Sequence, residues 1–432
     1  MLKSKRWSIV FLLSLGGAIN YMDRSAFAIA APMFANDLQL TPGELGIIFS
    51  SFSIGYALFN FVGGYASDRF GPKMVFAVSM AFWSFFCGLI GVAVGFASML
   101  IIRVLFGAGE GPFASTLNKI VNNWFPRREV ASAIGVATAG NPLGGALAGP
   151  IMGSLVLIIG WRMAFVAIAC LGVVWLLFWI KIAKDKPEEH KTISREELAL
   201  IQEGQQEQSD NNQEIEKVSM PLSFYIKQPT ILATAFAFFG LNYILFFFLS
   251  WFPSYLSNSQ HLSLKDMSIV SVIPWLLGSV GMAAGGFLCD YVLRKTGRPL
   301  FSRKIVLVTC LGASAIFVMC VGNVSSAAGA VSLMACGIFF LYLSATTYWA
   351  ILQDTVARQN MGSVGGMVHA TANIAGILGP IVTGYIIQWT GAYNAAFFIA
   401  GGIAVLGALA VAVFVKPIPM QRENVADVIR QE

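Results

Sequence analysis

Residues Gly64 to Lys73 read Gly-Tyr-Ala-Ser-Asp-Arg-Phe-Gly-Pro-Lys. The stretch closes one long apolar segment, residues 43–68, and opens the next, residues 73–92. The charges of Asp68 and Arg69 therefore gather at a short turn between two apolar segments. A polar turn between apolar segments of about 20 residues is typical of helices that cross a membrane and return. The stretch predicts a membrane hairpin.

The rest of the chain repeats this pattern. Hydrophobic residues make up 56% of the 432 residues and charged residues only 12%, with a mean hydropathy of +0.71. Soluble domains carry roughly 25% charged residues, so this composition excludes an ordinary soluble enzyme. The criterion of about 20 mostly apolar residues predicts twelve membrane-spanning helices. They lie near residues 8–31, 43–68, 73–92, 97–122, 130–158, 161–183, 228–255, 266–290, 302–322, 326–352, 361–387 and 392–415.

The positive charges predict the orientation. Of the 28 Lys and Arg residues, all but Arg24, Arg103, Arg162 and Lys265 fall on one side of the predicted spans. Lys and Arg concentrate in cytoplasmic loops, so both termini are predicted to be cytoplasmic. The first apolar segment has no small-residue cleavage site after it and is expected to be retained as a span.

One hydrophilic segment, residues 184–227, divides the chain into residues 1–183 and 228–432. Ser194-Arg195-Glu196-Glu197 has the spacing of a capping box and predicts a short helix within an otherwise solvated linker. The two halves also share motifs at a constant offset. Asn20-Tyr21 recurs as Asn242-Tyr243, and Gly64 with Asp68 recurs as Gly286 with Asp290. The chain is therefore predicted to be an all-α membrane protein whose twelve transmembrane helices form two six-helix pseudo-symmetric bundles around a central cavity.

The loop from Gly64 to Lys73 resembles the signature loop of the major facilitator superfamily. Residues Gly286 to Asp290 resemble a degraded second copy of the same motif. The resemblance implies the major facilitator fold and transport by alternating access. It also implies gating roles for Asp68, Arg69 and Asp290, because an exposed Asp with neighbouring cations can pair with helix ends in one state and release them in another.

A narrower resemblance covers nearly the whole chain. Tyr21-Met22-Asp23-Arg24, Arg103 and Glu110-Gly111-Pro112 resemble the anion:cation symporter family. Asn123 to Pro126 and Trp251 to Leu256 resemble it too. The resemblance implies proton-driven import of small organic anions, typically sugar acids, across the cytoplasmic (inner) membrane of bacteria.

Four ionisable residues lie deep within predicted spans. Asp23, Arg24, Arg103 and Glu110 should each cost several kcal/mol in lipid, so they are expected to face one another or a wet cavity. At a rise of about 1.5 Å per residue, the Asp23–Arg24 pair falls between Glu110 and Arg103 in depth. Our hypothesis assigns the substrate carboxylate to Arg24 and proton binding to Asp23 and Glu110, with Arg103 tuning one carboxylate. A purely structural ion-pair network is the alternative.

A sugar acid also needs neutral hydrogen-bonding partners. The substrate-binding candidates besides Arg24 are polar residues in the middle of spans: Tyr21, Tyr56, Asn141, Asn242, Tyr243, His369 and Asn373. For each one, a polar side chain satisfied by a neighbouring helix is the competing interpretation. His369 stands where the family commonly has Asn, so binding a hydroxyl, carrying a proton and simple packing all stay open.

No Gly-Lys dipeptide occurs, which excludes a phosphate-binding Gly-x-x-x-x-Gly-Lys loop and an ATP-driven pump within this chain. The three histidines are far apart in sequence, and the six cysteines are scattered singly, so no metal site is predicted. We expect no cofactor, protons as the coupling ion, a monomer in the lipid bilayer, no nucleic-acid partner and no enzymatic activity.

The predicted function is import of a hexonate, hexuronate or aldarate by proton symport. Two alternatives remain. Gly145 to Gly153 resembles part of a glycine-proline motif found in antiporters, which keeps organic-anion antiport open. The second alternative is a membrane receptor that binds an organic anion without transporting it.

Overall fold

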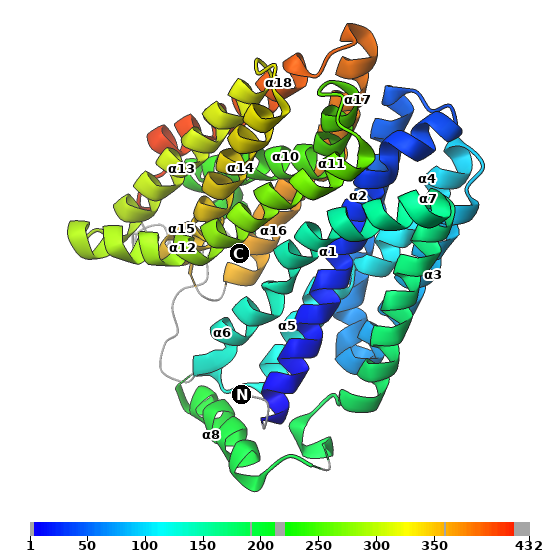
Figure 1. The fold of residues 1–432 in the computed structure, drawn as a ribbon. Helices are drawn as coiled ribbons and strands as arrows, with labels where there is room; N and C mark the ends of the chain where they lie inside the picture. The colour runs from blue at the N-terminus through cyan, green and yellow to red at the C-terminus, as the bar shows by residue number, and fades with distance from the viewer. Residues whose placement is uncertain (1–3, 191, 212–220, 358–359, 419–432) are drawn as a thin grey trace.

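The computed structural model describes residues 4–190, 192–211, 221–357 and 360–418, and these residues form helices joined by short turns. Figure 1 shows two groups of helices, which we call the first and second bundles. The first bundle consists of α1 (Lys5–Asp37), α2 (Pro42–Phe70), α3 (Pro72–Leu89), α4 (Phe96–Glu110), α5 (Phe113–Trp124), α6 (Arg127–Thr138) and α7 (Gly140–Ile182), with a 3-10 turn at Ile90–Val92. The second consists of α9 (Leu222–Ile226), α10 (Pro229–Asn258), α11 (Leu264–Val270), α12 (Val272–Thr296), α13 (Pro299–Val321), α14 (Ala327–Ser344), α15 (Thr347–Thr355), α16 (Met361–Asn373), α17 (Ala375–Thr390) and α18 (Asn394–Phe414). Between them lie a 3-10 turn at Pro187–Glu189 and α8 (Arg195–Asn211).

The described helices account for the predicted spans. Within the described residues, ten helical segments are long and apolar enough to cross a membrane. One of them, Ser132–Ile182, changes direction at Gly160. Its φ of 76° is a backbone conformation that glycine adopts easily, and the segment therefore supplies two spans. The remaining span is α1, whose mean hydropathy is lowered by polar residues such as Asp23 and Arg24 in its middle. The prediction of an all-α membrane protein with twelve spans is confirmed.

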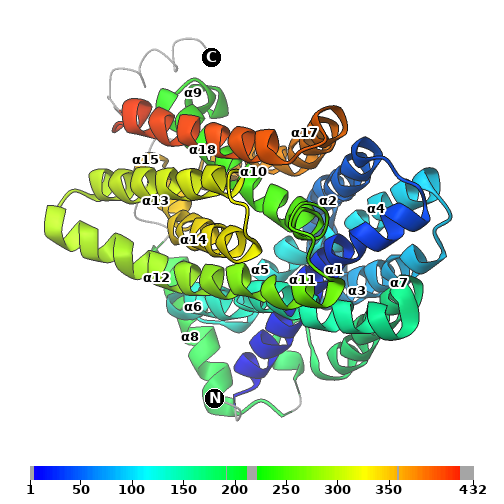
Figure 2. The same ribbon diagram turned by 45° about the horizontal axis from the view of Figure 1, so that its top comes forward.

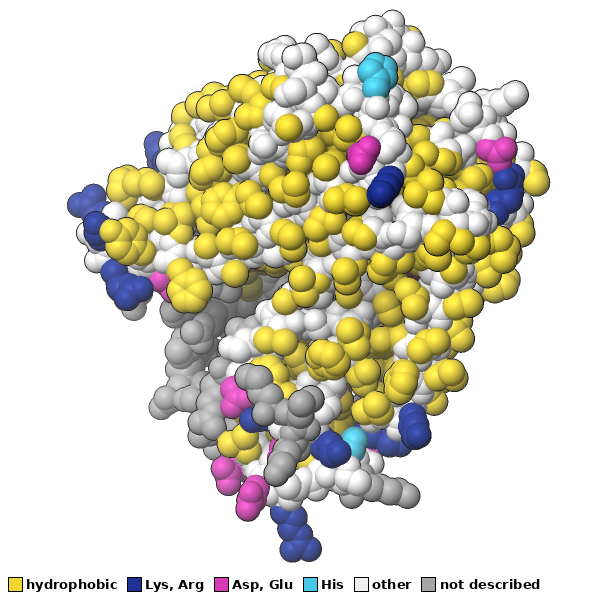
Figure 3. All heavy atoms as spheres, viewed as in Figure 1, with side chains coloured by type: hydrophobic (Ala, Val, Ile, Leu, Met, Phe, Trp, Pro, Cys, Tyr) yellow, Lys and Arg dark blue, Asp and Glu magenta, His cyan; other side chains and the backbone are white. Residues whose placement is uncertain are grey.

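The outer surface of the bundles is apolar, as a bilayer requires. Figure 3 shows hydrophobic side chains over a large part of the visible face, with Lys and Arg mainly along its edges. Large side chains such as Phe61, Val94 and Phe287 are exposed by 83%, 83% and 76%. Such extensive apolar exposure would be costly in water and is expected of a surface solvated by lipid.

The segment between the bundles is attached to the first bundle. The backbone N–H groups of Lys5 and Arg6 donate to the Glu197 carboxylate at 3.2 and 3.1 Å, which caps the start of α1. Asp185 Oδ1 accepts from the N–H of Lys73 at 2.7 Å and caps α3 in the same way. Ser194 caps α8 by accepting from the Glu197 N–H at 3.1 Å, so the predicted helix is confirmed. In a capping box, the Glu197 carboxylate would accept from the backbone N–H of Ser194. Here it accepts from the first N–H groups of α1 instead.

We call the side of the molecule that carries α8 the linker side and the other the far side. The bundles meet toward the far side, where α2 packs against α17 (Figures 1 and 2). The Gly43 N–H donates to Gln388 Oε1 at 3.0 Å, and Ser50 Oγ donates to the Ile377 carbonyl at 2.6 Å. A Cβ at Gly46 would lie 2.5 Å from the Pro380 carbonyl oxygen, so the close approach requires glycine.

A second contact between the bundles uses the glycines of α7. A Cβ at Gly145 would overlap the ring of Trp275 on α12, and a Cβ at Gly149 would lie 2.2 Å from the Ser268 carbonyl on α11. The run from Gly145 to Gly153 therefore lets α7 approach the second bundle closely. This packing explains the glycine pattern without deciding between symport and antiport.

Candidate substrate site between the two bundles

The centre of the site is an ion pair between α1 and the end of α4. Arg24 Nε donates to Glu110 Oε2 at 2.7 Å. Both side chains are buried, with exposed fractions of 9% for Arg24 and 0% for Glu110. Asn20, one turn before Arg24, is buried beside Glu110. The structure therefore brings together two of the four ionisable residues that the sequence places deep in the spans.

Aromatic rings surround the Arg24 guanidinium. Its Cζ lies 4.6 Å from the ring centroid of Phe52, 4.7 Å from that of Tyr56 and 5.4 Å from that of Tyr21. A cation is attracted to the faces of aromatic rings, and the attraction grows where water is excluded. The rings hold the guanidinium in place while leaving its outer edge available to an anion.

Asp23 points into the first bundle. It is buried, and its Oδ1 has no hydrogen-bond partner within the described part of the chain. Trp83 of α3 lies next to it, and the indole Nε1 also lacks a partner there. A buried carboxylate oxygen without a hydrogen bond is costly, so Asp23 is not explained by the packing of the first bundle alone.

Arg103 occupies an aromatic cage rather than an ion pair. Its Cζ lies 4.0 Å from the ring centroid of Phe27, 4.9 Å from that of Phe52 and 5.3 Å from that of Phe106. In the described residues, its Nε and Nη1 have no hydrogen-bond partner and no carboxylate lies within ion-pair distance. The tuning role predicted for Arg103 stays a prediction, and any such effect acts through space in this conformation.

A cavity of about 420 Å³ lies between the bundles and reaches Arg24. Its polar lining comes from both halves: Arg24, Ser53, Tyr56 and Asn60 from the first bundle, and His369 and Asn373 from the second. Binding pockets for small molecules typically measure about 300–1,000 Å³, so the cavity can enclose a six-carbon acid. On the far side it ends where α2 meets α17, because Ile377 both lines the cavity and accepts from Ser50.

Four of the predicted substrate-binding residues, Tyr21, Asn141, Asn242 and Tyr243, are not among those lining this cavity. Tyr21 contacts Arg24 and packs edge-on against Trp275 at 6.0 Å. Asn141 lies against Gly17 of α1. Asn242 donates to the Phe238 carbonyl of its own helix at 3.2 Å, and Tyr243 is buried beside Phe239. Their roles in binding stay predictions that no contact here tests.

The structure adds Asn60 and Ser53 to the candidates. Asn60 lies four residues after Tyr56 on α2, and residues at this spacing share a helix face. That spacing was a usable signal once Tyr56 had been selected.

The predicted gating residues lie at the linker side. Asp68 forms an ion pair with Lys119 of α5, within the first bundle. Arg69 Cζ lies 5.6 Å from the centroid of its neighbour Phe70, and the Asp290 carbonyl accepts from Arg294 Nε at 3.4 Å. Each of these described contacts stays within one bundle, so they do not hold the bundles together in this conformation.

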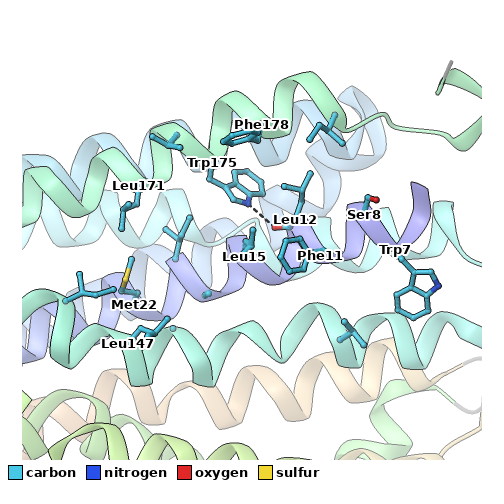
Figure 4. Close-up of a pocket in the computed structure, with 17 residues that line it drawn as sticks. Trp7, Ser8, Phe11, Leu12, Leu15, Met22, Leu147, Leu171, Trp175 and Phe178 are labelled. Atoms are coloured by element: carbon cyan, nitrogen blue, oxygen red, sulfur yellow. Dashed lines mark hydrogen bonds between the residues drawn. The ribbon is translucent and has the colours of Figure 1, made fainter. Parts of the chain in front are cut away.

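A different hollow lies on the outside of the first bundle. Figure 4 shows this groove of about 720 Å³ between α1 and α7, lined by residues such as Phe11, Leu147 and Phe178. Trp175 Nε1 donates to the Leu12 carbonyl at its floor at 2.9 Å. Ser8 and the indole of Trp7 are its main polar groups, so the groove cannot satisfy a polyhydroxylated anion.

Comparisons with known proteins agree with the fold. The family model described as Major Facilitator Superfamily matches residues 13–370 and 299–430. The chain is 51% identical over 420 residues to a hexuronate transporter of Bacillus subtilis, covering 97% of this chain and 96% of that protein. It is 31% identical to a probable galactarate/D-glucarate transporter of Bacillus subtilis, covering 96% and 93%. A solved structure of a bacterial homologue of the human lysosomal transporter Spinster, inward-facing and occupied, superimposes with a TM-score of 0.76 at 17% identity, covering 96% and 97%.

Proposed function

The chain belongs to the Major Facilitator Superfamily, and we propose that it imports a sugar acid together with protons by alternating access. As a member of this superfamily it is a multi-pass membrane transporter and not an enzyme. Two relatives are named for hexuronate and for galactarate and D-glucarate, which supports sugar acids as the substrate class.

The proposal depends above all on the buried pair of Arg24 and Glu110. Arg24 reaches the cavity, whereas Glu110 is fully buried behind it. Protonation of Glu110 would remove the negative charge that holds Arg24 and leave the guanidinium free to bind a carboxylate through charge-assisted hydrogen bonds. Loss of the proton would restore the competing carboxylate and expel the substrate. One proton and one anion are thereby linked at a single guanidinium.

The neutral groups around the cavity supply the hydroxyl partners. Tyr56 and Asn60 on one wall and Asn373 on the other each offer donors and acceptors to a polyol. Asp23 is a second proton-binding candidate because it is buried and its Oδ1 has no hydrogen-bond partner among the described residues. Proton binding at Asp23 would then change the electrostatic potential at Arg24, the next residue along α1.

The charge distribution supports an orientation in the membrane and, with it, an assignment of the conformation. The Lys and Arg residues favour a cytoplasmic linker side in a bacterial inner membrane, with both termini cytoplasmic. The cavity is closed toward the far side by α2 and α17. The structure would then correspond to the state that releases substrate into the cytoplasm.

The test is uptake of labelled glucuronate, galactonate and glucarate into proteoliposomes, with and without an inward proton gradient. We expect the gradient to drive accumulation of at least one of them. Exchange against internal substrate without gradient-driven accumulation would favour the antiporter, and binding without any flux would favour the receptor.

The role of Glu110 is tested in the same vesicles. Glu110→Gln keeps the shape of the side chain and a hydrogen bond to Arg24 but cannot exchange a proton. We expect it to abolish gradient-driven accumulation while leaving counterflow, and Glu196→Gln on the exposed face of α8 to behave as wild type. Full accumulation by Glu110→Gln would contradict the coupling role.

A further inference from the structure

The cavity wall contributed by the second bundle carries no permanent positive charge. Helices α10, α16 and α17, which supply that wall, contain no Lys or Arg at all. Its polar side chains are His369 and Asn373, beside the apolar Phe246, Ile374 and Ile377. A negative group placed against this wall would lose its water without gaining a cation.

The first bundle offers one cation to the cavity. Arg24 lines it, whereas the second buried guanidinium, Arg103, is enclosed by three phenylalanine rings and is absent from the lining. Arg24 is itself balanced by Glu110 at 2.7 Å. Neutralising Glu110 therefore releases one positive charge, which matches one carboxylate.

His369 is one of the two polar residues on this wall. Its ring lies 5.9 Å from the rings of both Phe238 and Trp349. The Asn373 amide donates to the His369 carbonyl at 2.8 Å and lies 3.2 Å from its Nδ1. The same amide nitrogen lies 3.3 Å from the other ring nitrogen, Nε2, so the two side chains form one polar patch on this wall.

Hexonates and aldarates with the same hydroxyl stereochemistry differ at one end of a six-carbon chain. A hexonate ends in a hydroxymethyl group where an aldarate ends in a second carboxylate. The two are nearly equal in size, so the cavity volume cannot separate them. The charge on the wall that receives the second end can separate them. Once alternating access closes the site around the substrate, an unpaired carboxylate costs far more than a hydroxyl.

We propose that this cavity selects sugar acids with one carboxylate and rejects dicarboxylates, and that His369 is the position that sets the selection. The inference rests on the proposed function and narrows its substrate class. With Arg24 holding the single carboxylate, the other end of the substrate meets an imidazole and an amide, which carry no permanent charge and fit hydroxyl groups. A permanent cation at position 369 would supply the missing partner for a second carboxylate.

The test compares matched ligands on the full-length protein. Binding of glucuronate, galactonate and galactarate is measured on purified protein at about pH 8, where an ordinary imidazole is neutral. The same ligands then compete for uptake of labelled glucuronate in proteoliposomes. In wild type we expect galactarate to bind at least about thirtyfold more weakly than the better of the two monocarboxylates.

Two substitutions separate charge from shape. His369→Arg should reduce the gap between galactarate and the monocarboxylate to less than about fivefold, whereas the neutral His369→Gln should leave the ratio within about twofold of wild type. Ratios are compared within each variant, so an overall loss of affinity does not affect the result. If His369→Arg does not fold, Asn373→Arg places a cation on the same wall and is used for the same comparison.

Equal binding of galactarate and the monocarboxylate by wild type would overturn the inference, as would an unchanged ratio in a folded His369→Arg protein. Binding and uptake of monocarboxylates without gradient-driven accumulation would contradict proton symport and leave the selection standing. Absence of binding by all three acids would contradict the proposed substrate class and the inference with it.

Discussion

At the scale of single residues, the site is a contrast between two buried guanidinium groups. Arg24 has a carboxylate partner, three aromatic neighbours and an edge on the cavity. Arg103 has an aromatic cage and no described carboxylate partner. The two arginines of one bundle thus have different environments, and a separate prediction follows from each.

Arg24→Lys should lower the initial rate of uptake at least about tenfold, chiefly through KM. An ammonium keeps the charge but loses the planar fork that meets a carboxylate and stacks on Phe52 and Tyr56. The measurement is uptake of labelled glucuronate over a range of concentrations. Arg195→Lys on α8 is the matched control, and an unchanged KM in Arg24→Lys would show that Arg24 does not bind the substrate.

Arg103→Leu should fold with a melting temperature no lower than that of wild type. The cage of Phe27, Phe52 and Phe106 can pack against leucine, and removal of a buried charge without a described partner offsets the loss of its ring contacts. Thermal unfolding of the detergent-purified protein measures this, with Arg303→Leu, which breaks an ion pair with Asp354 at 3.5 Å, for comparison. A sharp drop for Arg103→Leu would mean that the cage depends on the charge.

At the scale of elements, helix ends are stabilised by side chains from the linker. Glu197 of α8 accepts the first N–H groups of α1, and Asp185 accepts one at the start of α3. The positive end of a helix dipole favours such carboxylates. The N-terminal ends of two helices in the first bundle, α1 and α3, are therefore stabilised by the segment predicted from the sequence to be a hydrophilic linker.

Glu197→Ala should destabilise the first bundle by about 0.5–2 kcal/mol, the usual cost of losing an N-terminal cap. The side chain is largely buried against α1, with 11% exposed. A lowered melting temperature with an unchanged KM is the expected result. Glu196→Ala, its exposed neighbour, is the control, and equal melting temperatures for the two variants would contradict the capping role.

Several elements were predictable because their signals are local. The hairpin at Gly64 to Lys73, the apolar spans and the capping serine Ser194 each follow from neighbouring residues, and the structure contains all three. The chain reverses at Gly71, so Asp68 and Arg69 belong to the end of α2. The partner of Glu197 and the cage around Arg103 were not predictable. Both depend on residues distant in sequence, and only the packed arrangement of several helices brings those residues together.

At the scale of the whole molecule, the two bundles meet at the far side and the cavity lies below that contact. The Gly43 N–H to Gln388 bond and the tight fit of Gly46 against Pro380 hold α2 to α17. Alternating access requires this contact to separate. The contact is therefore a place where the motion can be stopped.

A disulfide across the contact should stop transport. Gly43→Cys and Gln388→Cys, introduced together into a chain with its native cysteines replaced, should cross-link under mild oxidation and abolish uptake. A reducing agent should restore it, and neither single variant should respond to oxidant. Uptake that continues in the cross-linked protein would show that α2 and α17 need not part.

The burial of Glu110 behind Arg24 also affects how strictly the flux of protons is coupled to the flux of the sugar acid. Glu110 has no exposed surface, and the guanidinium stands between it and the cavity. Because the negative charge of Glu110 must be removed before Arg24 can hold an anion, loading should be ordered, with the proton first and the anion second. Uncoupled entry of the anion should then be small, because an anion that arrives before the proton finds Arg24 already paired with Glu110.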